Sequence, residues 1–317
     1  MEEIRPLKPE DKGRLAELLG QIRQQTKRAA GLNFAASFPA TENLLRWLDA
    51  TCSSGAFGVF DGPHLVGVGY AHVLGQEGWI GPLGVFQIEQ GKGFEEKVLQ
   101  VTIQHLLANG VAVLGLEAPA APDWLGTLGR IGFSPSSTVL ALEVPVASLP
   151  DTMDFWVDAY SSKEGEAREK IDRALHQFAD TAAPGRNYLP LIHATRDLAL
   201  GDTLIFLEGD EIVGFAVVHT QPYYAGEGEE LARVVALACH TKRHVGRFDQ
   251  LLTAIGAYAR VNNLKRVRIR CASDDPTTYQ YLLSKGFRVN ECRLRLALEG
   301  YPEVKSPGYV VLSDWEL

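Results

Sequence analysis

The amino-acid sequence repeats one pattern of landmarks about 150 residues further along the chain. Three landmarks recur in the same order, pairing residues 61–72 with 208–219, residues 90–93 with 243–246, and Gly132-Phe133 with Gly286-Phe287. The offset grows only from 147 to 154 residues across these pairs, which chance matches would not preserve. The repeat therefore predicts a duplicated domain. The length of 317 residues agrees, because it suits two domains of ordinary size, each able to bury its own core.

Composition and charge indicate a soluble globular protein and argue against several classes of function. Hydrophobic residues make up 46% and charged residues 22% of the chain, which are ordinary values. The net charge of −8 and the lack of a basic stretch argue against a nucleic-acid partner. No apolar segment has the length of a leader or a membrane span, which predicts a cytoplasmic protein with no membrane partner. The four cysteines have no paired metal spacing, so we expect reduced thiols and no metal site.

Hydrophobic periodicity predicts the same order of elements in each half. In the first half we expect a helix through residues 15–22, a hairpin of strands 55–60 and 65–73, a strand at 79–86, a helix through 99–107, a strand at 111–116, a short helix ending before 132 and a strand at 139–146. In the second half we expect a helix through 171–178, a hairpin of strands 204–207 and 212–220, a strand at 231–239, a helix through 248–255, a strand at 267–271, a short helix at 276–285 and strands at 294–298 and 309–312. A small-residue stretch with a proline at 147–151 predicts the break between a first domain, 1–147, and a second, 152–317.

The chemistry that repeats lies where a strand gives way to a helix, at residues 90–95 and 243–248. A glycine in such a loop turns backbone N–H groups inward, and the helix N-terminus adds positive potential, so the loop suits phosphate oxygens. Lys92 in the first loop and Arg247 in the second would add charge-assisted bonds. A dinucleotide-binding Rossmann motif fits poorly, because Glu96 stands where its third glycine would fall. Glycines also end strands for structural reasons, so either loop alone is a weak indication.

Taken in order, these elements resemble the GNAT superfamily of N-acetyltransferases. Residues 90–93 and 243–246 are similar to the start of that family's acyl-CoA loop, and residues 128–133 and 282–287 to its later segment, which often reads Tyr-x-x-x-Gly-Phe. The resemblance covers nearly the whole chain and implies an α/β (α+β) fold of two tandem domains, each with a mixed, mostly antiparallel central sheet flanked by helices. It also implies an N-acyltransferase that moves an acetyl or other acyl group from acetyl-CoA to a primary amine of a small molecule or peptide, by direct attack in a ternary complex.

Both loops depart from the family pattern at their sixth position, where a small residue is usual. The first loop has Glu95, whose carboxylate would repel phosphates, and the second has the neutral Phe248 in an otherwise cationic stretch. We therefore expect the second domain to hold the acyl-CoA and the first to be structural or to shape the acceptor site. The cofactor-binding residues that this interpretation implies are Leu237, Ala238, Cys239, Arg243, His244, Val245, Gly246, Arg247 and Phe248, with Gln90, Gly91, Lys92 and Gly93 in the equivalent loop of the first domain.

Acyl transfer to an amine needs a base for the amine, a donor for the carbonyl oxygen and a proton for the departing thiolate. The resemblance implies that a backbone N–H on the splayed central strand is the donor. The candidate base is Glu230, before the central strand of the second domain, with Glu229 and Glu77 as alternatives, although each also reads as a solvated loop acid. The candidate acid is Tyr281, with Tyr279 as the alternative; both are out of register with the family's usual tyrosine, because Leu282 stands there. A one-residue offset rotates a helical side chain by about 100°, so a packing role is the alternative.

For some other residues, the sequence allows either a structural or a functional role. His72 and His219 recur at equivalent hairpin positions, either as buried, hydrogen-bonded histidines or as groups that face a substrate cleft. Cys239 ends the central strand of the second domain, where it is either a buried small hydrophobe or an acyl relay.

The acceptor and the class of function stay open. Residues 32–38, residues 223–230 and the region around Trp156 are candidate acceptor-lining segments by position. One alternative function is a non-catalytic acyl-CoA-binding or scaffold protein built from degenerate domains. Another is an aminoacyl transferase that acts on cell-wall precursors, which ranks last because no surface basic enough for transfer RNA is indicated.

Overall fold

The structure is a computed structural model that describes residues 2–32, 36–52, 54–151, 157–227, 230–241 and 246–315. Its second half repeats the elements of its first half. The first half forms β1 (Glu2–Pro6), α1 (Lys12–Ala29), α2 (Glu42–Cys52), β2 (Ala56–Asp61), β3 (His64–Leu74), β4 (Glu77–Val85), α3 (Phe94–Ala108), β5 (Val113–Ala118), α4 (Pro122–Ile131) and β6 (Phe133–Pro145). The second half forms β7 (Val157–Ala159), α5 (Gly165–Ala182), α6 (Leu189–Asp197), β8 (Gly201–Glu208), β9 (Glu211–His219), β10 (Leu231–His240), α7 (Gly246–Val261), β11 (Arg266–Ala272), α8 (Pro276–Ser284), β12 (Arg288–Leu298) and β13 (Tyr309–Ser313). Among the described elements only β13 has no counterpart in the first half, so the predicted duplication is confirmed.

Local sequence explains most of these boundaries. The two predicted hairpins turn at Gly62 and Gly209, whose φ angles are 58° and 61°, a region that favours glycine. The predicted helix through residues 99–107 lies within α3, which begins after Gly93 and ends at Ala108, with Asn109 as its C-cap. The helices α2 and α6 form in addition to the predicted elements. No helix in the described ranges is long and apolar enough to span a membrane.

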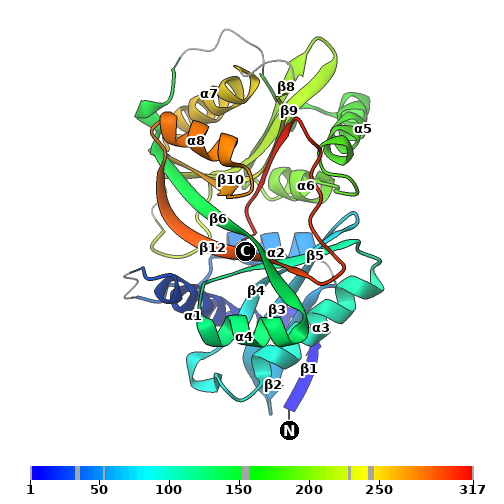
Figure 1. The fold of residues 1–317 in the computed structure, drawn as a ribbon, viewed down its shortest axis with the longest axis vertical. Helices are drawn as coiled ribbons and strands as arrows, with labels where there is room; N and C mark the ends of the chain where they lie inside the picture. Colours follow the sequence, from blue (N-terminus) through cyan, green and yellow to red (C-terminus); the bar gives the residue numbers. More distant parts are fainter. Residues whose placement is uncertain are drawn as a thin grey trace.

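One continuous mixed sheet joins both halves (Figure 1). Its spatial order is β1-β2-β3-β4-β5-β12-β6-β11-β10-β9-β8-β7, and β13 pairs with β10 off this path. Counted inward from the two ends of the sheet, β1 to β5 of the first copy and β7 to β11 of the second follow each other in the same order. The mixed sheet with helices around it confirms the predicted fold class.

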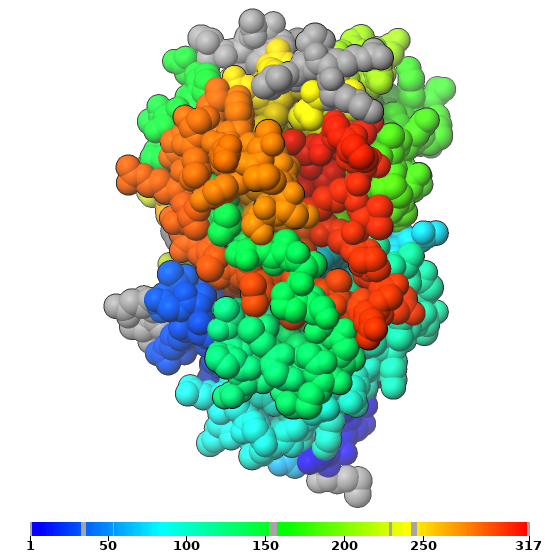
Figure 2. Space-filling view, viewed as in Figure 1, coloured from blue at the N-terminus to red at the C-terminus, as the bar shows by residue number. Residues whose placement is uncertain are grey.

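The two copies exchange the equivalent strands β6 and β12 at the centre of the sheet. β6 of the first half pairs with β11 of the second along residues 139–145, and β12 of the second half pairs with β5 of the first along residues 294–297. β6 and β12 also pair with each other. Figure 2 shows orange and red residues of the second half lying against green residues of the first across the middle of the molecule. The break at residues 147–151 stays a prediction, but each copy's sheet is completed by a strand of the other.

Strand alternation sends neighbouring side chains into different cores. On β9, Phe215 enters a core beneath α1, α2, α5 and α6 that spans both halves, whereas Ala216 enters a core beneath α7 and α8. On β4, Trp79 enters the shared core and Ile80 a core beneath α3 and α4. The sheet therefore has a shared helical layer on one face and a separate pair of helices for each copy on the other.

Candidate active site

The central strands of the first copy separate after a short ladder. β4 and β5 pair in parallel only from Glu77↔Val113 to Ile80↔Leu116. Beyond Ile80 lies Pro82, which has no N–H to donate, and from there β4 pairs with β3 alone. The edge of β4 that faces away from β3 is therefore open beside a widening gap.

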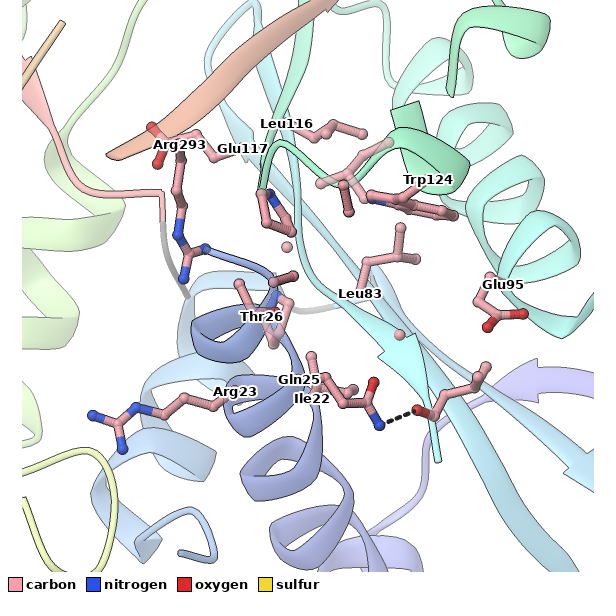
Figure 3. Close-up of a pocket in the computed structure, with 18 of the residues that line it drawn as sticks. Ile22, Arg23, Gln25, Thr26, Leu83, Glu95, Leu116, Glu117, Trp124 and Arg293 are labelled. Carbon is pink, nitrogen blue, oxygen red and sulfur yellow. Dashed lines mark hydrogen bonds between the residues drawn. The ribbon is translucent and has the colours of Figure 1, made fainter. Parts of the chain in front are cut away.

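A cavity of about 790 Å³ occupies this gap (Figure 3). Its walls come from α1, the end of β4, the loop into α3, the end of β5, and α4. In Figure 3, the Leu83 and Trp124 side chains lie near each other, and Ile22, Gln25 and Thr26 extend from α1. The far wall comes from the second half: Tyr223, Tyr224, Glu227, Arg233, Arg268, Arg293, Asp314 and Trp315. One continuous space thus joins the loop before α3 to residues of both copies.

The predicted loop of the first copy lies at one end of the cavity. Gln90, Gly91 and Gly93 line it, and the two glycines have φ angles of 78° and 81°. Gln90 Nε2 donates to Gln25 Oε1 at 2.9 Å, which ties the loop to α1. Lys92 is not among the lining residues, because its ammonium turns to Glu89 at 2.6 Å. The loop thus offers backbone at the cavity and keeps its cation outside.

Acidic side chains surround the start of α3. Glu95 and Glu96 lie in its first turn, and both line the cavity. Burial raises the pKa of Glu95 above its ordinary value. A helix N-terminus favours negative charge, so Glu95 takes the place where a ligand's phosphate would gain most from α3.

The wall from the second half is built around Glu227. Its carboxylate accepts from Arg23 at 2.6 Å, from Arg233 at 3.1 Å and from the backbone N–H of Tyr223 at 3.0 Å. Arg233 stacks over the ring of Tyr223 at 4.1 Å, and Arg23 over that of Tyr224 at 4.4 Å. Burial raises the pKa of Glu227, but Arg233 and Arg23 outweigh it and hold the pKa below its usual value. This carboxylate is a fixed anion and a poor base, within the segment predicted to line the acceptor site.

In the second copy, the equivalent gap contains a strand of the chain itself. The β10–β11 ladder ends at Arg233↔Arg268, as short as that between β4 and β5. From there β13 pairs with β10, from Ala236↔Ser313 to His240↔Tyr309. The predicted cofactor residues Leu237, Ala238 and Cys239 are therefore paired with β13 on one side and β9 on the other. No such strand lies between β4 and β5 in the described sheet.

The other described residues at the second-copy loop also contact groups of the protein itself. Arg247 is buried, makes a two-pronged ion pair with Glu208, and donates to His240 Nδ1 at 2.8 Å. Phe248 points inward and is 4% exposed, and Gly246 is the first residue of α7. The predicted cofactor residues Arg243, His244 and Val245 lie outside the described residues.

Neither predicted catalytic residue lines the cavity. The Glu230 carboxylate pairs with Lys265 at the surface. The Tyr281 ring lies against Phe248, with centroids 5.7 Å apart, and beside Lys285. Leu282, which stands at the family's tyrosine position, is fully buried. Glu230 and Tyr281 thus have different partners, and neither is among the residues that line the cavity.

The equivalent position in the first copy has no hydroxyl either. Leu128, on α4, is fully buried. Of the alternative bases, Glu77 is buried against Arg186 and Trp79, and Glu229 lies outside the described residues, as does Trp156.

The recurring histidines are buried structural groups. His72 bonds to Cys52 Sγ at 3.2 Å and to the carbonyl of Gly81 at 2.6 Å. His219 bonds to Thr195 Oγ1 at 2.8 Å and to the Tyr223 hydroxyl. Burial lowers the pKa of His72 to about 4 and that of His219 to about 3, so both are neutral at pH 7. Burial also raises the pKa of the Cys239 thiol to about 12, which removes the thiolate that a relay needs.

The sequence did not predict several of the residues that line the cavity. Trp124 and Thr127 come from α4, and Asp314 and Trp315 follow β13. The indication available in the sequence was the apolar run 309–312, which has no partner in the repeat. Within the described part of the chain, no group of three or more His, Cys, Asp or Glu residues is arranged to hold a metal ion.

Comparison with solved structures shows the fold. A proposed acetyltransferase from Pyrococcus horikoshii aligns with 99% of this chain and 95% of its own, at a TM-score of 0.71 and 14% identity. A GCN5-related N-acetyltransferase from Sphaerobacter thermophilus aligns with 96% of this chain and 98% of its own, at 0.63 and 14%. A tandem GNAT protein from the clavulanic acid biosynthesis pathway aligns with 96% of this chain and 100% of its own, at 0.60 and 12%. No protein-family model and no curated protein matches the sequence.

Proposed function

Because this chain has the tandem fold of the GNAT N-acetyltransferases, we propose that it transfers an acyl group from acyl-CoA to a primary amine, with the acyl-CoA in its first copy. The observation that carries the proposal is the open gap between β4 and β5, which contains the cavity of about 790 Å³. This choice of copy departs from the prediction made from loop charge. It is favoured because β13 takes up the equivalent gap of the second copy.

The residues of the first copy suit an acyl-CoA ligand in most respects. The open edge of β4 beyond Pro82 offers main-chain N–H and C=O groups, which an extended amide-containing arm can pair with as an added strand. Leu83 and Leu116 line the same space and suit its apolar parts. Gly91 and Gly93 leave open space at the loop, since an added Cβ would meet no atom within 4 Å. Glu95 opposes the fit, because a carboxylate there repels phosphate.

The acceptor would approach from the wall that the second half supplies. The carboxylates on that side are already paired: Glu227 with Arg23 and Arg233, Glu117 with Arg270 and Arg295, and Asp314 with Arg270. The proposal therefore assigns no general base from this wall. The amine loses a proton to water, its nitrogen bonds to the acyl carbon, the carbon–sulfur bond breaks, and the coenzyme A thiolate leaves and takes a proton from water. The acyl oxygen takes a hydrogen bond from main-chain N–H on β4.

Titration calorimetry with acetyl-CoA tests the choice of copy when wild type is compared with Leu83→Trp, which fills the gap from β4. We expect wild type to bind and the variant, checked for an unchanged melting temperature, to lose binding. Free-thiol release from acetyl-CoA over a panel of amines tests the transfer. Absence of acetyl-CoA binding by the wild type would refute the proposal.

A binding protein without turnover is the second candidate. It is favoured by Leu128, which places no hydroxyl at the position of the family's usual tyrosine, and by Glu95 at the loop. It predicts acetyl-CoA binding with no thiol release over the same amine panel. A single amine that is turned over many times rules it out.

A further inference from the structure

A second, smaller cavity adjoins the large one. Its volume is about 10 Å³, which is room for one water-sized group. Four residues line both cavities: Ile80, Gly81, Asp314 and Trp315. The other described residues that line the small cavity are Trp47, His72, Trp79, Leu191, Val235 and Ser313. Because each of the four touches both spaces, together they form the wall that separates the small cavity from the large one.

Trp315 is the largest side chain in this wall, and its neighbours hold it in place. The residue is 7% exposed, and its ring stacks on that of Trp79 with centroids 4.6 Å apart. Its indole N–H donates to Ser313 Oγ at 2.5 Å. Trp79 in turn donates to the Glu77 carboxylate and has the guanidinium of Arg295 over its ring at 5.0 Å. Trp315 is therefore a fixed part of the wall.

The strand side of the wall is fixed as well. The carbonyl of Gly81 bonds to the His72 ring at 2.6 Å. Ile80 forms the last pair of the β4–β5 ladder, opposite Leu116. The wall is therefore held by the sheet on one side and by the stacked tryptophans on the other.

If acyl-CoA binds in the first copy as proposed, its acyl end lies against this wall. β4 leads directly into the loop that contains Gly91 and Gly93. A donor whose phosphates lie at that loop extends its arm back along residues 82–85, as an added strand would. The thioester at the end of the arm then reaches Gly81, which belongs to the wall.

A long acyl chain has no room at this position. The small cavity lies directly behind Trp315, but the ring closes it, and its volume admits only one small group. The other direction open to a long chain is the part of the large cavity where the amine approaches. A chain that turned there would exclude the acceptor, so only a short acyl group leaves the site competent for transfer.

We propose that Trp315 sets the length of the acyl group, so that acetyl and propanoyl groups are transferred and hexanoyl groups are not. This inference rests on the proposed function and names the class of acyl donor. Trp315 follows β13, so a residue of the second half selects the acyl group that the first copy holds.

Acetyl-CoA, butanoyl-CoA and hexanoyl-CoA test the proposal as donors to the best amine of the panel. Trp315→Phe keeps a stacked ring and makes it smaller, and Trp315→Leu removes the ring. Trp47→Phe is the matched control, because Trp47 lines the small cavity and not the large one. The Trp47 indole N–H has no hydrogen-bond partner among the described residues, so this control loses ring size and no hydrogen bond.

We expect the wild-type kcat/KM to be at least about tenfold lower with hexanoyl-CoA than with acetyl-CoA, because methylene groups that do not fit an apolar site are strongly rejected. In Trp315→Phe and Trp315→Leu the ratio of hexanoyl to acetyl transfer should rise about tenfold. The ratio in Trp47→Phe should stay within about twofold of wild type, a difference of that size being small against the expected shift. Combining Trp47→Phe with Trp315→Phe should raise the ratio above that of Trp315→Phe alone, since the two changes enlarge one joined space.

The ratio separates selection of the chain from a loss of packing, which would lower transfer from all three donors alike. Equal wild-type use of acetyl-CoA and hexanoyl-CoA would overturn the proposal without any variant. An unchanged ratio in both Trp315 variants would also overturn it. A changed range of amines with an unchanged ratio would place Trp315 in the acceptor site instead.

Titration calorimetry with the same donors, in the absence of amine, separates this inference from the proposed function. If binding shows the chain-length preference and its shift in the Trp315 variants, yet no amine is acylated, the role of Trp315 stands and the transfer proposal fails. If amines are acylated with an unchanged ratio, the proposed function stands and the role of Trp315 is refuted. If wild type binds none of the donors, both are refuted.

Discussion

Trp315 stacks on Trp79, with ring centroids 4.6 Å apart and ring planes 15° from parallel. Trp79 lies on β4 of the first copy, and Trp315 follows β13, which is paired in the gap of the second copy. The Trp315 indole N–H donates to Ser313 Oγ at 2.5 Å, and the backbone N–H of Asp314 donates to the carbonyl of Val235 at 2.8 Å. One segment thus fills the second gap and forms part of the wall of the first.

Replacing Trp315 should destabilise the protein. Trp315→Ala removes a buried ring from the core that both halves share, so we expect the free energy of unfolding to fall by about 3 kcal/mol. Trp315→Phe keeps a stacked ring and should lose about 1 kcal/mol. Urea denaturation followed by circular dichroism measures both. An Ala variant as stable as wild type would contradict the packing described.

The exchanged strands make each copy depend on the other. A fragment of residues 1–151 lacks β12, which lies between β5 and β6. Its sheet would then have two open edges and an exposed core face. We expect no cooperative thermal unfolding from this fragment or from residues 152–317 alone, and recovery of cooperative unfolding when they are mixed. A cooperative transition in either isolated fragment would show that the exchange is dispensable.

Removing the carboxylate at the start of α3 should tighten acyl-CoA binding. Glu95→Gln removes a negative charge from the cavity end where phosphates would lie, and we expect the acetyl-CoA Kd to fall about threefold to tenfold. Loss of a helix-terminal acid costs about 0.3–1 kcal/mol of stability. Glu166→Gln is the control, because Glu166 also lies in the first turn of a helix, α5, and does not line the cavity. Equal acetyl-CoA affinities in the two variants would place the phosphates elsewhere.

The cation of the second loop should matter for stability and not for acyl-CoA. Arg247 pairs with Glu208 and His240, so Arg247→Ala should lose about 1 kcal/mol of stability. The acetyl-CoA Kd should stay within about twofold of wild type, a difference of about 0.4 kcal/mol. Titration calorimetry with acetyl-CoA on wild type and Arg247→Ala measures both Kd values. A large loss of acetyl-CoA affinity in Arg247→Ala would indicate that the acyl-CoA binds in the second copy.

Two buried histidines should make stability depend on pH. The pKa of His72 is lowered to about 4 and that of His219 to about 3, whereas both have an ordinary value near 6.5 when unfolded. Below pH 6.5 the unfolded chain therefore binds more protons, and stability falls as pH falls towards the folded-state values. From pH 7 to 5.5 we expect a loss of about 1 kcal/mol per histidine. His219→Gln should remove about half of that pH dependence; an unchanged dependence would contradict the burial of His219.

Local sequence was sufficient to predict most of the elements and their order, although it did not predict the helices α2 and α6. The hairpin turns at Gly62 and Gly209, the start of α3 after Gly93 and the family resemblance all depend on residues that are close in the chain. Strand partners are a different matter. The apolar pattern of β6 and β12 predicts buried strands, but the same pattern suits pairing within a copy or between copies.

The site was harder to predict for the same reason. Counting charges along residues 242–247 indicated a cationic loop, whereas Arg247 is neutralised by Glu208, which lies 39 residues away in sequence. The strand at residues 309–312 was predicted, but only the folded sheet shows that it lies in the gap beside β10. The arginines of the far wall come from strands of the second copy, and no spacing in the sequence brings them to the first.

The central claim is that the acyl-CoA lies in the first copy, and a crystal structure with coenzyme A bound tests it most directly. We predict density for the ligand between β4 and β5, alongside residues 82–85, with its phosphates near Gly91 and Gly93 and with β13 still paired to β10. Density at the start of α7, with β13 displaced from β10, would contradict the account.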